Sequence, residues 1–199
     1  MTVVIGLTGS IATGKSTISH MFSEFDIPVI DADQLSREVV EPGEKAYESI
    51  IDTFGNHILH EDGTLDRKAL GSIVFKDESK RETLNGIVHP AVRERMIAKR
   101  DQYKAEHYPA VVLDIPLLFE SKLSHYVDKI IVVYVDETIQ LERLMHRDKS
   151  SQAEAMERIQ AQIPVKEKAE MAHEIIDNSQ SRESSYHQLK HILSKWNIL

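Results

Sequence analysis

The segment GSIATGKST at residues 9–17 constrains the fold of this chain more than any other feature. Two glycines, a lysine and a serine in it fit the pattern G-x-x-x-x-G-K-[ST]: Gly9, Gly14, Lys15 and Ser16. A loop of this kind must follow a strand and open a helix. The apolar run 3–7 precedes it, and apolar residues recur at helical spacing over 18–25. The sequence therefore predicts a strand, a phosphate-binding loop and a helix in succession.

The chemistry of this loop points to a nucleoside triphosphate bound with Mg²⁺. Backbone N–H groups of such loops wrap phosphate oxygens, the lysine reaches the β- and γ-phosphates, and the hydroxyl meets the metal ion. The helix N-terminus adds its unpaired N–H groups and partial positive charge. The residues expected to contact ATP are Ser10, Ile11, Ala12, Thr13, Gly14, Lys15, Ser16 and Thr17. A glycine-rich turn that binds no ligand is the alternative.

Composition excludes several classes of protein. A formal net charge of −8 over 199 residues argues against a protein that coats nucleic acid, because phosphate contacts need clustered Lys and Arg. The chain has no cysteine, which excludes disulfide frameworks and cysteine nucleophiles. No segment approaches the ~20 apolar residues of a membrane span, and the N-terminus has no signal-peptide pattern. We expect a cytoplasmic protein without nucleic-acid or membrane partners.

Four further apolar runs predict strands that are buried on both faces. They are residues 27–30, 110–115, 130–135 and 174–176. Helical patterns separate these runs, and a last helical stripe ends the chain: Leu189, Ile192, Leu193 and Trp196. Strands that alternate with helices predict a layered α/β fold around a parallel sheet, with ligands at the carboxyl ends of the strands.

Two intervals interrupt this alternation. Residues 41–106 open with the turn signal EPG and show helical stripes without a strand-like run, which predicts a helical insertion that binds the acceptor substrate. A plain structural helical hairpin is the alternative. Residues 148–172 contain Ser151 and Glu154 at capping-box spacing and predict two helices joined at Pro164, as a lid over the triphosphate. The nucleotide-binding core then comprises residues 1–40, 107–147 and 173–199.

Phosphoryl transfer also needs a group that receives the proton of the acceptor. Asp33, in VIDAD, follows the second predicted strand, so we expect it at the rim of the sheet near the phosphate loop. A carboxylate there can orient an alcohol and accept its proton. Asp31 is its rival, and N-capping of a helix by either residue is the alternative.

Cationic and metal-binding groups are expected near the triphosphate. Arg143 and Arg147 are four residues apart on one face of a predicted helix, where guanidinium groups can bind the transferring phosphoryl group. A solvated face on which Glu142 and Asp148 serve as partners is the alternative. Asp114 ends the third predicted strand, where other phosphate-loop proteins place a carboxylate that holds Mg²⁺ through water. A strand-end turn is its alternative role.

Histidines offer little to the chemistry. His187 and His191 have helical i, i+4 spacing, but no glutamate follows the first, so the pattern is not that of a metalloprotease and predicts surface positions. His89 precedes Pro90 inside the predicted insertion, at an expected helix break. Contact with substrate and a structural role both remain open for His89.

Nearly the whole chain resembles the dephospho-coenzyme A kinase family. The matching segments are IGLTGSIATGKST, VIDAD followed by VVEPG, DGTLDR with ALGSIVF, IVHP, IPLLFE, QLERLMHRD and IIDN. The phosphate loop alone marks a very large superfamily, whereas the later segments in this order are more selective. The resemblance implies a P-loop kinase with a three-layer α/β fold, a five-stranded parallel sheet, a helical acceptor domain and a lid. It further implies ATP-dependent phosphorylation of the ribose 3′-hydroxyl of dephospho-coenzyme A, the last step of coenzyme A synthesis.

The resemblance also assigns roles to individual residues. The catalytic residues it implies are Asp33 as base, Lys15 and Arg143. The substrate contacts it implies are Thr8, Asp33, His89, Leu117 and Phe119. Arg147 and Asn178 fall where further nucleotide contacts are expected, and Ser16 and Asp114 where Mg²⁺ is expected. At Ala12 the family usually has glycine, so the backbone there must tolerate a Cβ.

Three rival functions differ in what they require. A GTPase needs an N-K-x-D motif and a D-x-x-G switch after a strand, and the chain has neither, since Asp114 begins the run DIPL. A nucleoside or nucleoside monophosphate kinase differs only in its acceptor pocket, so the residues alone leave it open. A non-catalytic ATP sensor has no use for Asp33 and paired arginines. The sequence leaves the oligomeric state open.

Overall fold

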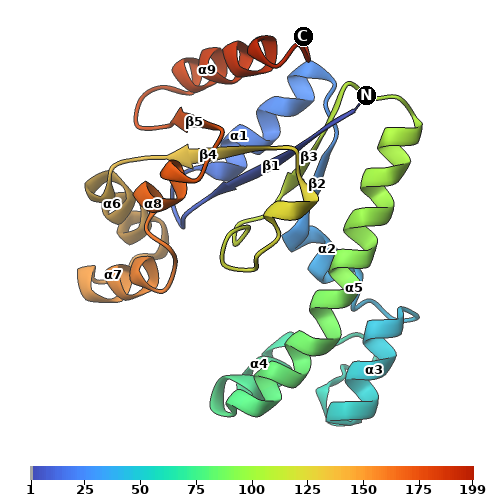
Figure 1. Cartoon of the computed structure of the whole chain (residues 1–199). Helices are drawn as coiled ribbons and strands as arrows, with labels where there is room; N and C mark the ends of the chain where they lie inside the picture. Colours follow the sequence, from blue (N-terminus) through green and yellow to red (C-terminus); the bar gives the residue numbers. More distant parts are fainter. Residues whose placement is uncertain (1) are drawn as a thin grey trace. The chain divides into compact units, whose positions relative to one another are not determined.

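A computed structural model describes residues 2–199 and contains a five-stranded parallel sheet (Figure 1). The strands are β1 (Val3–Gly9), β2 (Val29–Asp31), β3 (Ala110–Asp114), β4 (Lys129–Tyr134) and β5 (Glu174–Asp177). Their order in the sheet is β2-β3-β1-β4-β5. The predicted strand number and parallel α/β class are therefore confirmed. The second strand begins two residues later than predicted, after Pro28, whose ring nitrogen cannot donate a hydrogen bond.

β1 forms the centre of the sheet because it pairs with a strand on each side. Leu7 lies opposite Asp114 of β3, and Gly9 lies opposite Val133 of β4. Ile5 and Leu7 of β1 are fully buried and Val4 is nearly so, as expected for a strand covered on both faces. The carboxyl ends of β1, β3 and β4 are consequently held at one edge of the sheet.

Helices cover both faces of this sheet. One face packs against α1 (Lys15–Met21), which continues into the short helix η1 (Phe22–Phe25), and against α9 (Arg182–Lys195) (Figure 1). The predicted C-terminal stripe is confirmed there, since Leu189 and Leu193 are fully buried in the core. Between β3 and β5 the chain also forms the short helix η3 (Ser124–Tyr126) before β4, and after β4 the helices α6 (Glu137–Asp148), α7 (Gln152–Gln160) and α8 (Val165–Glu170).

The two helices predicted within residues 148–172 are both present. Ser151 accepts a hydrogen bond from the Glu154 N–H, and the Glu154 carboxylate bonds back to the Ser151 N–H at 2.8 Å. This reciprocal capping box begins α7, and Pro164 precedes α8. The local pattern therefore predicted both helix starts correctly.

The chain divides into two compact units. One comprises Asp31–Lys99, and the other comprises Met1–Ile30 together with Arg100–Leu199. The smaller unit contains α2 (Ala32–Glu38), α3 (Lys45–Phe54), η2 (Asn56–Ile58), α4 (Arg67–Lys76) and most of α5 (Glu78–Ala105). It has its own apolar core, in which Ile50 and Ile58 are fully buried. The predicted insertion, 41–106, overlaps this unit but begins ten residues later than Asp31 and ends seven residues after Lys99.

The expected helix break at His89 and Pro90 is wrong. α5 runs without interruption through Pro90, and His89 is exposed on it. Proline removes one backbone hydrogen bond from a helix interior, and here the apolar side chains on the same helix, such as Ile87 and Val92, pack against the core of the smaller unit. This packing outweighs the preference of proline against a helix interior, so α5 continues through Pro90.

Among residues 2–199, no helix is both long enough and apolar enough to cross a bilayer.

Candidate active site

The phosphate loop, residues 10–14, joins the end of β1 to the start of α1. The predicted strand–loop–helix context is therefore confirmed. Gly14 has a left-handed backbone, with φ of 84° and ψ of 24°, and the first turn of α1 begins directly after it with Lys15. The first N–H groups of a helix have no partner within the helix, so the start of α1 suits an anionic ligand.

Asn178 explains why position 14 must be glycine. It follows β5, is only 7% exposed, and donates from Nδ2 to the Thr13 carbonyl at 2.9 Å. Its Oδ1 accepts from the Ser185 hydroxyl at 2.8 Å. A Cβ on Gly14 would lie 2.2 Å from Asn178 Nδ2, closer than atoms approach without bonding. Asn178 thus supports the loop from the protein side, while the ATP contact expected of it stays a prediction.

Ala12 also has a left-handed backbone, with φ of 62°. For a residue with a Cβ this conformation costs about 1–2 kcal/mol. The side chains of Ile11 and Ala12 pack against the buried residues Leu144 and Ile159 of α6 and α7, so the methyl group has apolar partners. This packing is the physical reason that the loop tolerates alanine at this position.

Lys15 forms a short ion pair with Asp114 at the end of β3. The Asp114 side chain is 2% exposed and that of Lys15 is 18% exposed. Parallel pairing sets Asp114 level with Leu7 of β1, so its carboxylate lies within reach of the first residue of α1. Ser16, the predicted metal-binding hydroxyl, is exposed. The structure therefore brings Lys15 and Asp114 together, a pairing that the sequence did not predict.

The two predicted arginines differ in their surroundings. Arg143 donates from Nη2 to the Asn178 carbonyl at 3.0 Å. Its Nη1 lies 3.9 Å from the point that a Cβ would occupy if one were added to Gly14. It is therefore adjacent to the phosphate loop. Arg147 is exposed and makes two hydrogen bonds to the neighbouring Asp148 carboxylate, at 2.8 and 3.1 Å. The solvated pairing foreseen as the alternative is what the structure has for Arg147.

Asp148 binds two arginines at once. Besides Arg147, it forms a short ion pair with Arg158 of α7. The hydrogen bonds from Arg147 chiefly, and then those from Arg158, lower the pKa of Asp148 from 3.8 to about 2. The same pairing raises the pKa of Arg147. Asp148 thereby links α6 to α7 at the molecular surface.

Three predicted acceptor contacts lie in or beside β1 and the loop after β3. Thr8 is fully buried and donates from Oγ1 to the Pro116 carbonyl at 3.0 Å. Leu117 is 42% exposed and Phe119 is partly exposed, on either side of the fully buried Leu118. The Thr8 hydroxyl is thus used inside the protein, and substrate contact by any of these residues stays a prediction.

Asp33 and His89 belong to the smaller unit. There Asp31 is the N-cap of α2, because its carboxylate accepts the N–H groups of Asp33 at 2.7 Å and Gln34 at 3.1 Å. Asp33 is exposed in the first turn, and no residue of the described part of the chain, 2–199, donates a hydrogen bond to its carboxylate. The two rival aspartates therefore have different local environments.

Sequence reasoning missed three polar side chains that contact the phosphate loop or its flanks. Gln140 donates to the Ile11 carbonyl at 2.8 Å, and Gln162 accepts from the Ile11 N–H at 2.9 Å. Lys168 of α8 is fully buried and pairs with Glu120 at 2.8 Å. Gln140 and Lys168 are buried, whereas lysine and glutamine occur mostly at protein surfaces, so no local signal marked these two residues.

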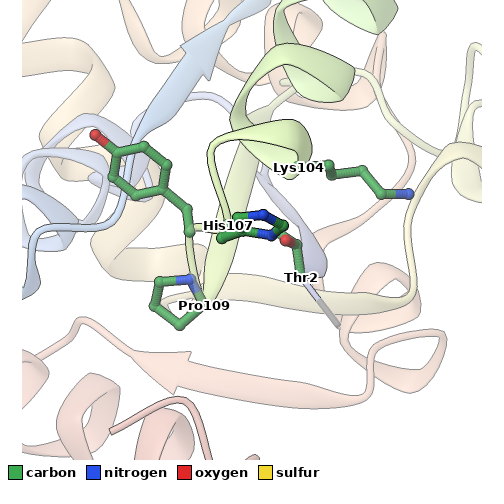
Figure 2. Close-up of a pocket in the computed structure, with 5 residues that line it drawn as sticks. Thr2, Lys104, His107 and Pro109 are labelled. Atoms are coloured by element: carbon green, nitrogen blue, oxygen red, sulfur yellow. The ribbon is translucent and has the colours of Figure 1, made fainter.

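Two cavities of about 290 Å³ lie at opposite ends of the strands. One is beside the phosphate loop, where Ser10, Tyr134 and Gln140 line it. The other, shown in Figure 2, lies where β1 and β3 begin and is lined by Thr2, Lys104, His107, Tyr108 and Pro109. Ligands of open α/β sheets bind at the carboxyl ends of the strands, which is where the first cavity lies.

The parallel sheet, the strand–loop–helix and Lys15 at the start of α1 define a P-loop kinase fold. Solved structures that share it include shikimate kinase from Bacteroides thetaiotaomicron, with a TM-score of 0.51 at 18% identity over 96% of this chain and 98% of that one. At such low identity the likeness shows the fold alone.

Closer matches give the family. The family model described as Dephospho-CoA kinase matches residues 3–184, so this chain belongs to the dephospho-CoA kinase family. Dephospho-CoA kinase from Oceanobacillus iheyensis is 60% identical over all of both chains, and that from Bacillus thuringiensis is 57% identical over the same extent. The solved dephospho-CoA kinase of Campylobacter jejuni has a TM-score of 0.75 at 31% identity, over 99% of this chain and 100% of that one. Enzymes of this family phosphorylate dephospho-CoA with ATP in the last step of coenzyme A biosynthesis.

Gly14→Ala should weaken ATP binding by roughly tenfold or more, because its Cβ strains a left-handed backbone and collides with the Asn178 amide. Isothermal titration with ATP and Mg²⁺ measures the effect. Gly86→Ala is the matched control, since a Cβ at Gly86 meets nothing within 4 Å. Equal ATP affinity in the two variants would contradict the role of the Gly14–Asn178 contact.

Arg147→Gln should raise the pKa of Asp148 from about 2 toward 3.8, because the largest cause of the lowering is removed. A depressed carboxyl pKa stabilises the folded state above about pH 3.8, and this contribution is lost as the pH falls toward 2. Carbon-detected NMR titration of the side-chain carboxyl measures the change. Arg182→Gln, which removes a partner of Glu24 instead, should leave the Asp148 titration unchanged.

Proposed function

We propose that this chain transfers the γ-phosphoryl group of ATP to the 3′-hydroxyl of the ribose of dephospho-CoA. The observation that carries the proposal is the phosphate loop, with Lys15 at the start of α1, in a chain that matches its family over residues 3–184. Phosphoryl transfer depends on positioning and on neutralisation of phosphate charge. A rigid cradle of backbone N–H groups with an adjacent lysine meets both needs.

ATP occupies residues 10–17 in this proposal. The Lys15 ammonium moves from the Asp114 carboxylate to the β- and γ-phosphates, because both are anionic partners for the same group. Arg143, which lies beside Gly14, supplies a second cation to the transferring phosphoryl group. Arg147 contacts the nucleotide in exchange for its pairing with Asp148.

Mg²⁺ is the cofactor that we propose, held by the Ser16 hydroxyl and through water by Asp114. No group of three His, Cys, Asp or Glu side chains within residues 2–199 is placed to hold a metal ion. Mg²⁺ needs no such cage, because it keeps several waters and binds one or two protein groups together with substrate phosphates. One exposed hydroxyl and one carboxylate therefore fit this ion. When bound, it neutralises charge on the β- and γ-phosphate oxygens.

Asp33 is the proton acceptor in this proposal. Asp31 already uses Oδ1 of its carboxylate to cap α2, where it accepts the N–H groups of Asp33 and Gln34. Asp33 has no such hydrogen bonds from residues 2–199, so its oxygens are available to the acceptor hydroxyl. The helical unit, which carries Asp33, is the part of the chain to which we assign acceptor binding.

An ADP-release assay with ATP and Mg²⁺ should show turnover with dephospho-CoA and little turnover with adenosine, AMP or CMP. Mass spectrometry of the product should show one added phosphate. The expected preference is at least 100-fold in kcat/KM, since a site built to bind the acceptor's polar groups rejects analogues that lack them. Preference for a nucleoside or a nucleotide would overturn the acceptor assignment and leave the phosphate loop assignment intact.

Asp33→Asn should lower kcat by about 10²–10⁴-fold while ATP affinity stays near that of the unmodified chain, because the base is lost and the ATP site is not. Asp31→Asn is the matched control: asparagine caps helices as well as aspartate, so turnover should change little. If Asp31→Asn abolishes turnover and Asp33→Asn does not, the two roles are assigned to the wrong residues.

A further inference from the structure

Lys168 is the only lysine or arginine with a fully buried side chain among the described residues, 2–199. It lies on α8, at 0% exposure, in a chain whose other lysines and arginines reach solvent. Burial of an ammonium group is costly unless it is paired and hydrogen-bonded. The hydrogen-bond partners of a buried ammonium group therefore indicate which segments of the chain it holds together.

The partners of Lys168 all flank the candidate active site. Its Nζ donates to the Gly9 carbonyl at 3.2 Å and the Pro116 carbonyl at 3.4 Å, and it pairs with Glu120 Oε1 at 2.8 Å. Gly9 is the last residue of β1 before the phosphate loop. Pro116 also accepts from Thr8, the residue before Gly9. The ammonium therefore joins the end of β1 to the loop after β3.

The segment before α8 makes further contacts with the phosphate loop. Ser10 donates from Oγ to the Ile163 carbonyl at 3.2 Å, and the Ile11 N–H donates to Gln162 Oε1 at 2.9 Å. Glu120 Oε1, the partner of Lys168, also accepts from the Ile163 N–H at 3.2 Å. These bonds attach the segment to the first two residues of the loop, and Lys168 attaches α8 to the residue before them.

The backbone around Gly9 is tightly packed, so the loop has little freedom once its entry is fixed. A Cβ on Gly9 would lie 2.7 Å from Thr13 Oγ1 and 3.0 Å from the Val133 carbonyl. Thr13 is fully buried and bonds back to the Ser10 carbonyl at 2.9 Å. The direction of the Gly9 carbonyl therefore sets the turn that presents the loop N–H groups.

We propose that Lys168 is a positioning residue for ATP: its buried ammonium fixes the Gly9 carbonyl and thereby pre-organises the phosphate loop, while Glu120 serves to neutralise its charge. The inference rests on the proposed function only for the identity of the ligand as ATP. Two consequences distinguish it from a purely structural ion pair. Loss of Lys168 weakens ATP binding, and this loss persists when the buried charge of Glu120 is removed as well.

Four variants test the proposal by equilibrium titration with ATP and Mg²⁺, without acceptor, together with thermal unfolding. Lys168→Met should weaken ATP binding by about tenfold or more, since a hydrogen bond to a charged group is lost at the loop entry. It should also lower the unfolding midpoint by roughly 5–15 °C, because Glu120 is left buried without its partner. Glu120→Gln should lower the midpoint while ATP affinity stays within about twofold, because the Lys168 donors remain.

The double variant Lys168→Met/Glu120→Gln decides between the two roles. Removing both charges should restore much of the unfolding midpoint, because neither group is left unpaired, while ATP affinity remains about tenfold low. Wild-type ATP affinity in this double variant would overturn the proposal, and it remains measurable if Lys168→Met alone does not fold. Lys190→Met, which removes an exposed lysine of α9, is the matched control and should change neither quantity.

Failure of this inference and failure of the proposed function can be told apart by two different measurements. Turnover of dephospho-CoA by the unmodified chain tests the acceptor assignment, whereas the titrations test only ATP binding. A chain that binds ATP and fails to phosphorylate dephospho-CoA would overturn the proposed function and leave the Lys168 test valid.

Discussion

The candidate site depends first on the parallel pairing of β1 with β3 and β4. A central strand paired on both sides has a fixed carboxyl end, so the loop that follows it starts from a defined position. The same register brings the end of β3 beside the loop, where Asp114 pairs with Lys15. Binding of a triphosphate needs N–H groups that already point toward the ligand, because reorganisation at binding would cost affinity. The sheet supplies this rigidity before any ligand is present.

Buried polar side chains then select one conformation of the loop. Asn178 holds the Thr13 carbonyl, Gln140 and Gln162 hold the two backbone groups of Ile11, and Lys168 holds the Gly9 carbonyl. Each bond satisfies a backbone group that would be costly to bury unpaired. The supporting side chains come from α6, from the turn before α8, from α8 and from the end of β5. The conformation of the phosphate loop therefore depends on side chains from several elements of the larger unit. Through Lys168, α8 is one of these supporting elements.

The aspartates near the candidate site differ in what their carboxylates bind within the protein. Asp31 caps α2 and Asp148 binds two arginines, so both carboxylates are committed to structure. Asp114 is buried and pairs with Lys15. Asp33 accepts no hydrogen bond on its carboxylate from residues 2–199, which is why we propose it, and not Asp31, as the proton acceptor. Proton acceptance by a carboxylate requires this availability, which is why neighbouring aspartates serve different purposes.

The sequence by itself determined the features that depend on neighbouring residues. The loop pattern and the flanking periodicity defined β1, the loop and α1, apolar runs located all five strands to within about two residues, and Ser151 with Glu154 marked the start of α7. Tertiary structure decided the contacts that join distant segments. Lys15 meets Asp114 across 99 residues, Lys168 meets Gly9 across 159, and Asn178 meets Thr13 across 165. Tertiary packing also keeps α5 helical through Pro90, although proline disfavours a helix interior. Periodicity and motifs encode which face of an element is apolar, whereas the partner of a buried polar group is set only when the sheet order brings the segments together.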